Sequence, residues 1–169
     1  MEFEEIRKAL EEEFGPDALL RNEPDGVDVG LDEFMTVSVV AEPTSHEVVL
    51  FAEIGVLPDV GREEFYEQAL KANWLFAGGA GAVLAINPET GVLSLNRTYP
   101  MNTLDKGKFL ALARSFAETY NLWIQFAGIW TDEVVERVIG GEAEDGAPEG
   151  AVPSAGEILM DLRNGFIRG

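Results

Sequence analysis

Hydrophobic residues recur every three or four positions in three stretches of the chain, at residues 3–14, 62–77 and 105–127. This spacing places the hydrophobic side chains on one side of a helix, so each stretch is predicted to be helical. The third helix is predicted to weaken or end at Gly128, and Thr131 is suited to cap a further short helix. One predicted helix therefore lies near the start of the chain, one in its middle and one after residue 104.

β-rich runs, several with alternating hydrophobic positions, predict strands between these helices. Residues 27–31, 35–40 and 46–54 predict a three-stranded meander, because turn-forming residues separate the last two. After the second helix, residues 82–87 and 92–97 flank a Pro-Glu-Thr-Gly turn and predict a hairpin. The predicted fold class is α+β, in the order α-β-β-β-α-β-β-α, with an antiparallel twisted sheet packed with helices.

The predicted elements form one domain over residues 1–128, followed by a C-terminal extension over residues 129–169. A chain of 169 residues is long enough for one domain with a proper core. Within the extension, residues 140–154 are rich in glycine, proline and acidic residues and predict a flexible linker. A capping-box sequence at residues 154–157 then precedes a short apolar run. It predicts a helix that is too short to fold alone and that docks on another surface.

Two predicted elements carry more apolar surface than one core requires. On the central helix, Tyr66, Leu70 and Trp74 form a stripe beside the stripe that faces the core. On the third predicted strand, Val49 and Phe51 point away from the apolar residues that alternate with them. Exposed apolar patches of this kind commonly mark binding sites. Each second face is therefore expected to be covered by another chain or available to a ligand.

The composition is that of a globular protein, with 46% hydrophobic residues and a mean hydropathy near zero. No apolar run approaches the roughly 20 residues that cross a bilayer. The first residues lack the basic start and apolar core of a secretory signal. Cysteine is absent, which excludes disulfides and is compatible with a reducing compartment. We therefore expect a cytoplasmic protein that does not bind a membrane.

The formal net charge is −19, from 31 acidic and 12 basic residues. Binding to nucleic acid needs clustered lysine and arginine, so this acidic protein is not expected to bind it. The charge has two interpretations: it keeps a protein with exposed apolar surface soluble, or it indicates a basic or apolar partner.

The candidate catalytic and metal-binding residues do not form a site in the sequence. His46 is the single histidine and has no cysteine or second histidine near it to complete a metal shell. Residues 78–81 resemble a phosphate loop in composition, but they follow a helix and precede a strand, the reverse of the order that aims a helix N-terminus at phosphate. Glu53 is interpreted as a solvent-facing or interface position of its strand. We expect no metal, no cofactor and no catalytic residue, so the protein is not predicted to be an enzyme.

Three segments in this order of elements have distinctive sequences. Residues 51–58 are Phe-Ala-Glu-Ile-Gly-Val-Leu-Pro, residues 69–75 are Ala-Leu-Lys-Ala-Asn-Trp-Leu, and residues 79–88 are followed by Leu-Ser-Leu at 93–95. Together they resemble the type III secretion chaperones of the Tir chaperone (CesT) family. The first segment is similar to the family's strand that ends in Gly-x-Leu-Pro, the second to its Leu-x-x-Asn-x-Leu helix and the third to its hairpin. The resemblance covers roughly residues 2–127.

The resemblance implies a cytoplasmic homodimer that binds the N-terminal segment of a secreted effector and keeps it secretion-competent without catalysis. The implied dimer contacts are Tyr66, Leu70, Trp74, Leu84, Ile86, Leu93 and Leu95. The implied apolar grooves for the effector are formed by Leu10, Phe14, Val37, Val39, Val49 and Phe51. An alternative is a regulatory or immunity-type binding domain of similar α+β fold that binds a folded protein partner.

Overall fold

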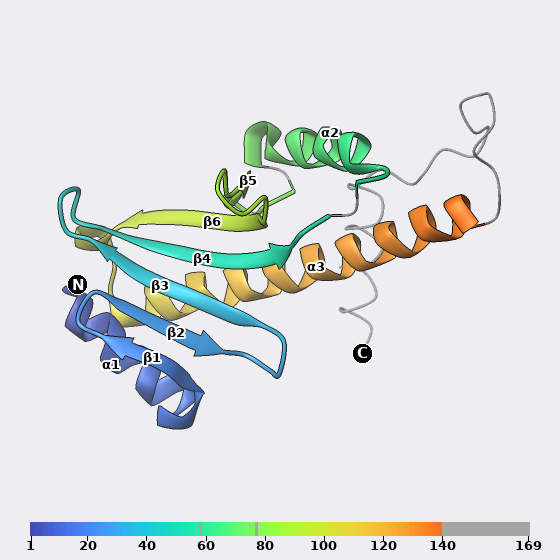
Figure 1. Cartoon of the computed structure of the whole chain (residues 1–169). Helices are drawn as coiled ribbons and strands as arrows, with labels where there is room; N and C mark the ends of the chain where they lie inside the picture. Colours follow the sequence, from blue (N-terminus) through green and yellow to red (C-terminus); the bar gives the residue numbers. More distant parts are fainter. Residues whose placement is uncertain (58, 77, 140–169) are drawn as a thin grey trace, which may run out of the picture.

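A six-stranded antiparallel sheet lies at the centre of the structure, a computed structural model that describes residues 1–139 apart from 58 and 77 (Figure 1). The elements are α1 (Phe3–Phe14), β1 (Leu19–Glu23), β2 (Gly26–Gly30), β3 (Thr36–Glu42), β4 (Glu47–Gly55), α2 (Arg62–Asn73), β5 (Val83–Ile86), β6 (Leu93–Pro100) and α3 (Lys106–Ile139). The strand order in the sheet is β1-β2-β3-β4-β6-β5. The predicted α+β class and its antiparallel sheet are confirmed.

The sheet has one strand more than the sequence pattern predicts. Three strands are predicted before the central helix and the structure has four, because Leu19–Glu23 forms β1 and pairs with β2. β1 has no fully buried residue, and its sequence, Leu-Leu-Arg-Asn-Glu, does not alternate between hydrophobic and polar residues, so the hydrophobic pattern does not predict a strand here. Its pairing with β2, joined through the tight turn between Glu23 and Gly26, forms the strand.

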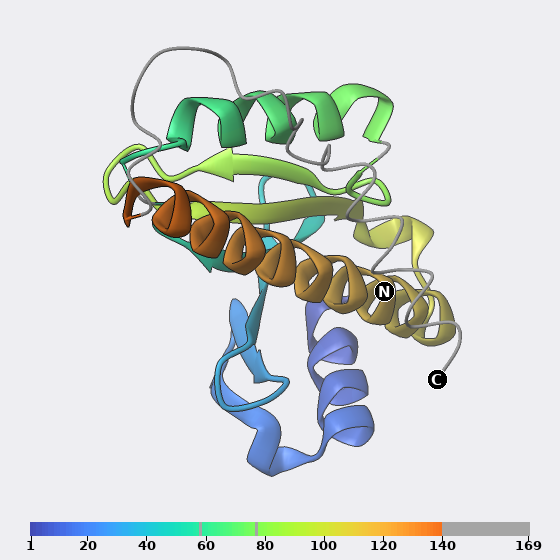
Figure 2. The same cartoon turned by 90° about the vertical axis from the view of Figure 1, so that its right-hand side faces the viewer.

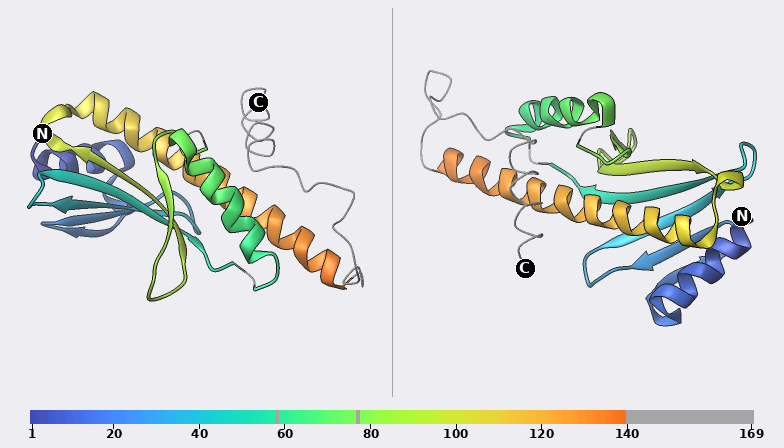
Figure 3. Two further views of the ribbon diagram at one scale, coloured as in Figure 1. Left: turned by 90° about the horizontal axis from the view of Figure 1, so that it is seen from above. Right: turned by 180° about the vertical axis from the view of Figure 1, so that it is seen from behind.

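One face of the sheet is buried under α1 and α3, which both lie in front of it in the right-hand view of Figure 3. On β4 the buried side chains alternate: Val48, Leu50 and Ala52 are buried, as the sequence pattern predicts. Ion pairs of Lys106 with Glu12 and of Arg114 with Glu13 join α1 to α3. The hydrophobic core therefore lies between this sheet face and the two helices.

α3 continues through the position where the sequence predicts a break. It runs unbroken from Lys106 to Ile139 and includes Gly128. Phe126 and Trp130, on either side of this glycine, are buried. Their packing offsets the cost of about 1 kcal/mol that glycine carries inside a helix. The predicted linker at residues 140–154 and the apolar run after it lie outside the described residues.

Two tryptophans of α3 hold α2 near both of its ends. The indole Nε1 of Trp123 donates to the carbonyl of Gly78 at 3.0 Å, and that of Trp130 donates to the carbonyl of Gly61 at 3.3 Å. Between them, Phe65 of α2 packs edge-on against both indole rings and lies 5.2 Å, centroid to centroid, from Phe126. α2 is thereby fixed along the C-terminal half of α3, at the opposite end of the sheet from α1 (Figure 2).

Candidate protein-binding surfaces

Large apolar side chains are exposed at the end of α2 and on the neighbouring edge strand β5. Leu70 and Trp74 are 70% and 72% exposed. We call the set the α2–β5 surface, and its members are Leu70, Trp74, Leu75, Phe76 and Ile86. Exposure of several large apolar groups on adjoining elements is typical of an interaction site.

The side chain of Asn73 joins the end of α2 to β5. Its Nδ2 donates to the carbonyl of Leu84 at 3.0 Å, and its Oδ1 accepts from the N–H of Leu84 at 2.9 Å. This amide therefore makes the pair of bonds that a further strand would make with Leu84. The β5 edge of the sheet is closed at this residue, and α2 and β5 form one continuous support for the α2–β5 surface.

α2 is shorter than the helix predicted from the sequence pattern, which runs to residue 77. It ends at Asn73, and a 3₁₀ turn (Trp74–Phe76) follows, in which Leu75 and Phe76 have φ values of 52° and 57°. Bulky residues rarely adopt this left-handed conformation, which carries strain. The turn leads into Gly79, where a Cβ would lie 2.2 Å from the carbonyl oxygen of Ala82. Such a tight return requires glycine, and it directs Trp74, Leu75 and Phe76 to the surface.

The residues predicted for the dimer interface divide into exposed and buried groups. Leu70, Trp74 and Ile86 are exposed and Tyr66 is half-buried. The others, Leu84, Leu93 and Leu95, lie in the core of the single chain. The exposed members coincide with part of the α2–β5 surface, and the buried members support it from within.

The residues predicted for effector grooves are not brought together in one place. Leu10, Val37 and Val39 are core residues, each 5% exposed or less. Phe14 is half-buried at the end of α1. Val49 and Phe51 are half-buried on β4 and alternate with its core residues, so they belong to the sheet face that points away from the core.

On that sheet face, the half-buried apolar residues lie on neighbouring strands. Val49 pairs directly with Val40 of β3, and Phe51 pairs with Ser38. On their other side, Thr98 and Asn96 of β6 are the direct partners of the same two residues. We call Val40, Val49 and Phe51 the outer sheet face, which is a mixed apolar and polar surface.

Two exposed apolar residues at the other edge of the sheet were not predicted as site residues. Leu20 lies on edge strand β1 and is 67% exposed, and Phe34 lies between β2 and β3 and is 88% exposed. Asp32 stabilises the loop that carries Phe34, since its Oδ1 accepts hydrogen bonds from the N–H groups of Phe34 and Met35. In the sequence, the Leu19-Leu20 pair next to Arg21 is the one sign that Leu20 could be a site residue. The exposure of Leu20 at a sheet edge depends on β1, a strand that the hydrophobic pattern does not predict.

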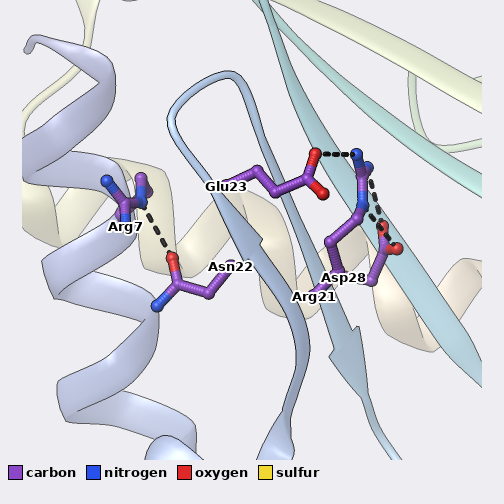
Figure 4. A network of polar contacts seen from close by, with 5 residues as sticks. All are labelled: Arg7, Arg21, Asn22, Glu23 and Asp28. Carbon is purple, nitrogen blue, oxygen red and sulfur yellow. Dashed lines mark hydrogen bonds and ion pairs between the residues drawn. The ribbon is translucent and has the colours of Figure 1, made fainter.

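A polar network fastens β1 to its neighbours (Figure 4). Arg21 forms two hydrogen bonds with the carboxylate of Asp28 on β2, at 2.8 and 3.2 Å, and an ion pair with Glu23. Arg7 of α1 donates to Asn22 at 2.8 Å. The hydrogen bonds from Arg21 lower the pKa of Asp28 below its usual value. These contacts hold β1 in place although few of its side chains are buried.

The described residues contain no group of three or more histidine, cysteine, aspartate or glutamate side chains placed to hold a metal ion. His46 is exposed in the turn between β3 and β4, and Glu53 is exposed on β4. Among the helices of the described part of the chain, none has the length and apolar character of a membrane span. The surfaces with large exposed apolar side chains are candidates for binding another protein.

Known folds resemble this one. A chain of the ExsC–ExsE complex has a TM-score of 0.59 at 16% identity, covering 73% of this chain and 94% of its own. A chain of the ExoU–SpcU complex from the type III secretion system of Pseudomonas aeruginosa has a TM-score of 0.56 at 17% identity, with coverages of 72% and 97%. The E. coli protein YbjN, described as a candidate transcription regulator, has a TM-score of 0.55 at 12% identity, with coverages of 76% and 93%. At these identities the likenesses establish a shared fold.

No curated protein matches this chain at a significant level. The sequence does match the model of the Tir chaperone protein (CesT) family, over residues 8–123. The matched region runs from α1 into the middle of α3, and it includes the central helix and hairpin whose motifs carry the resemblance. The chain therefore belongs to the Tir chaperone protein (CesT) family.

Proposed function

We propose that this protein is a non-catalytic chaperone that binds the N-terminal segment of a type III secretion effector and keeps it soluble and competent for secretion. The observation that carries the proposal is family membership over residues 8–123, combined with apolar side chains left exposed at both ends of the sheet. One of the similar folds comes from a chaperone–effector complex, and another is a type III secretion chaperone bound to a fragment of a second protein. Such a protein acts before export, so we place it in the cytoplasm.

The edge strand β1 offers a sheet edge on which an extended effector segment can bind. β5 is closed at Leu84 by Asn73, whereas β1 is the last strand at the other end of the sheet. An added strand gains backbone hydrogen bonds at such an edge and places alternate side chains against nearby apolar groups. At β1 the exposed apolar group is Leu20. Phe14, at the end of the preceding helix α1, is a second apolar residue close to β1 in the sequence. We assign effector binding to the β1 edge and to the outer sheet face, with Leu10, Val37 and Val39 as core support.

The α2–β5 surface is suited to a second copy of the chain. A twofold interface uses the same patch on both subunits, so a patch of large apolar residues becomes buried on each side at once. The formal charge of −19 opposes nonspecific association of a chain with this surface exposed. We therefore propose a homodimer in which Leu70, Trp74 and Ile86 make the central contacts.

Coexpression tests the proposed function directly. The chain is coexpressed with the first ~100 residues, about the length of one small domain, of each secreted effector encoded nearby. One effector segment is expected to become soluble and to be protected from protease in the complex. A Leu20→Asp variant should lose this protection, and Glu89→Gln, at an exposed position in the turn between β5 and β6, is the control that should retain it. If no effector segment is solubilised, the chaperone proposal fails.

A regulatory or immunity-type domain that binds a folded partner is the second candidate. The fold likeness to YbjN favours it, because that protein is described in regulatory terms. The two candidates differ in the state of the bound partner. Hydrogen exchange on the purified complex distinguishes them: a chaperoned segment exchanges fast outside the contact, whereas a folded partner shows protection throughout its own core.

A further inference from the structure

A second apolar surface lies at the N-terminal end of α2, away from the α2–β5 surface. Val56 and Val60 are 65% and 56% exposed, and Ile129 on α3 is 38% exposed. The hydrogen bond from Trp130 to Gly61 brings this part of α3 against the residue that follows Val60. We call Val56, Val60 and Ile129 the Val60 surface.

Arg62 contacts two of the residues that lie between the two valines. Its Nη2 donates to the carbonyl of Leu57 at 2.8 Å and pairs with Asp59 at 2.7 Å. Leu57 itself is buried. Val56 and Val60 are therefore exposed next to residues that are fixed to α2 or to the core, which lowers the cost of ordering them when an occupant binds.

The sequence beyond the described residues contains a segment suited to cover this surface. After the capping-box residues 154–157, apolar side chains recur at helical spacing at Ile158, Leu162 and Phe166, with Leu159 beside them. A helix of this length is not stable alone in water and needs a surface to bury its apolar side. Residues 124–169 lie beyond the part of the chain that the family model matches, so this segment is an addition to the family fold.

The length of chain favours the Val60 surface over the sheet edge at β1. From Trp130 to the end of α3 at Ile139 the helix rises by about 14 Å, at 1.5 Å per residue. The sequence predicts a flexible linker at residues 140–153, and a linker of that length has a root-mean-square span of about 20 Å, which is enough to return to Val60. The N-terminal end of α3, where α1 is attached, is about 50 Å from Ile139 along the helix, near the limit of that linker fully extended.

Charge orients the segment on this surface. Residues 154–167 carry Glu157 and Asp161 in their first part and Arg163 after them, so the basic side chain lies towards the C-terminal end of the segment. Next to the Val60 surface, the first turn of α2 carries exposed Glu63 and Glu64. Opposite charges at the rim of an apolar contact orient the two elements and disfavour the reversed arrangement.

We propose that residues 154–167 form an amphipathic helix that docks on the Val60 surface of the same chain. Ile158, Leu159 and Leu162 cover Val56, Val60 and Ile129, and Arg163 faces the start of α2. Docking there leaves the α2–β5 surface free for the second copy. The proposal is independent of the chaperone function, since it concerns the extension beyond the family fold.

Disulfide trapping tests this docking in the full-length protein, because the natural chain has no cysteine. Leu159→Cys is combined in turn with Val60→Cys, Leu70→Cys or Leu20→Cys, and the rate of disulfide formation is measured. The Val60 pair is expected to form an intramolecular bond at least tenfold faster than the other two pairs. Equal rates, a faster Leu70 or Leu20 pair, or a product that joins two chains would overturn the proposal.

A second measurement uses trypsin cleavage after Arg163 and needs no engineered cysteine. Val60→Asp and Leu162→Asp should each raise the cleavage rate about tenfold, whereas Leu20→Asp, at an exposed leucine on β1, should leave it unchanged. Thermal unfolding of each variant shows whether the domain itself is intact. An unchanged cleavage rate in an intact Val60→Asp protein would contradict docking at this surface.

Discussion

Asn73 satisfies both backbone groups of Leu84, with its side-chain amide acting as a short substitute for a neighbouring strand. One residue therefore ends α2, closes the β5 edge and sets the distance between the two elements of the α2–β5 surface. Asn73 thus blocks the β5 edge at Leu84, and β1 is the edge strand at the opposite end of the sheet.

Replacing Asn73 tests this relationship. Asn73→Ala leaves the N–H and C=O of Leu84 without their partner, and the free energy of unfolding should fall by about 1–3 kcal/mol. Urea denaturation followed by circular dichroism measures the change. Asn102→Ala, at an exposed position before α3, is the control and should change stability by less than about 0.5 kcal/mol. Equal effects of the two substitutions would contradict a specific role for Asn73.

Trp130, which is buried and bonds to the start of α2, should contribute far more to the free energy of unfolding than Trp74, which is exposed at the end of α2. Trp130→Ala removes a buried ring and its bond to Gly61, so we expect a loss of about 3–5 kcal/mol. Trp130→Phe keeps most of the packing and should lose about 1 kcal/mol, the value of the hydrogen bond. Trp74→Ala is the matched control, with an expected loss below about 1 kcal/mol in a monomer. Denaturant unfolding at low protein concentration checks all three, and a Trp74 effect as large as that of Trp130 would count against the α2–α3 packing described.

The proposed dimer predicts a change of mass on substitution of the α2–β5 surface. The wild-type protein should scatter light as a particle of twice the 18.4 kDa chain. Leu70→Asp or Trp74→Asp places a charge in the centre of the contact, and the mass should fall to that of one chain. Leu20→Asp, on the far edge of the sheet, should remain dimeric. A wild-type monomer at micromolar concentration would contradict the dimer.

The Arg21–Asp28 pair predicts a specific dependence of stability on pH. Hydrogen bonds from Arg21 lower the pKa of Asp28 in the folded state. The pair therefore stabilises the fold above the unfolded-state pKa of about 3.9, and this contribution is lost as pH falls through the lower folded-state value. Asp28→Asn should be less stable than wild type at pH 7, and the difference should shrink as the pH is lowered below about 4.

Urea midpoints of both proteins from pH 7 down to pH 2 measure that difference. Arg21→Gln should show the same convergence with wild type at low pH, because it removes the other half of the pair. A difference between wild type and Asp28→Asn that stays constant over this range would show that the ion pair does not contribute.

The outcome at α3 shows why local pattern and final structure differ. Gly128 is a helix-weakening residue by intrinsic preference, and a break there is a reasonable prediction. Phe126 and Trp130 are buried against Phe65 of α2, which lies about sixty positions earlier in the chain. The pattern of residues around Gly128 contains no information about this contact. The same applies to β1, whose strand conformation depends on pairing with β2 and on Arg21.

The sequence by itself determined the elements whose apolar residues repeat with a clear period: α1, β4 and its alternating burial, and the β5–β6 hairpin with Gly91 at positive φ in its turn. It also determined the family, through motifs in a fixed order. Only the tertiary structure decided which apolar residues are available to a partner. Leu84, Leu93 and Leu95 are covered by the chain's own core, whereas Leu70 and Trp74 are exposed. Periodicity identifies the side of an element that is apolar, but what covers that side is set by packing between distant parts of the chain.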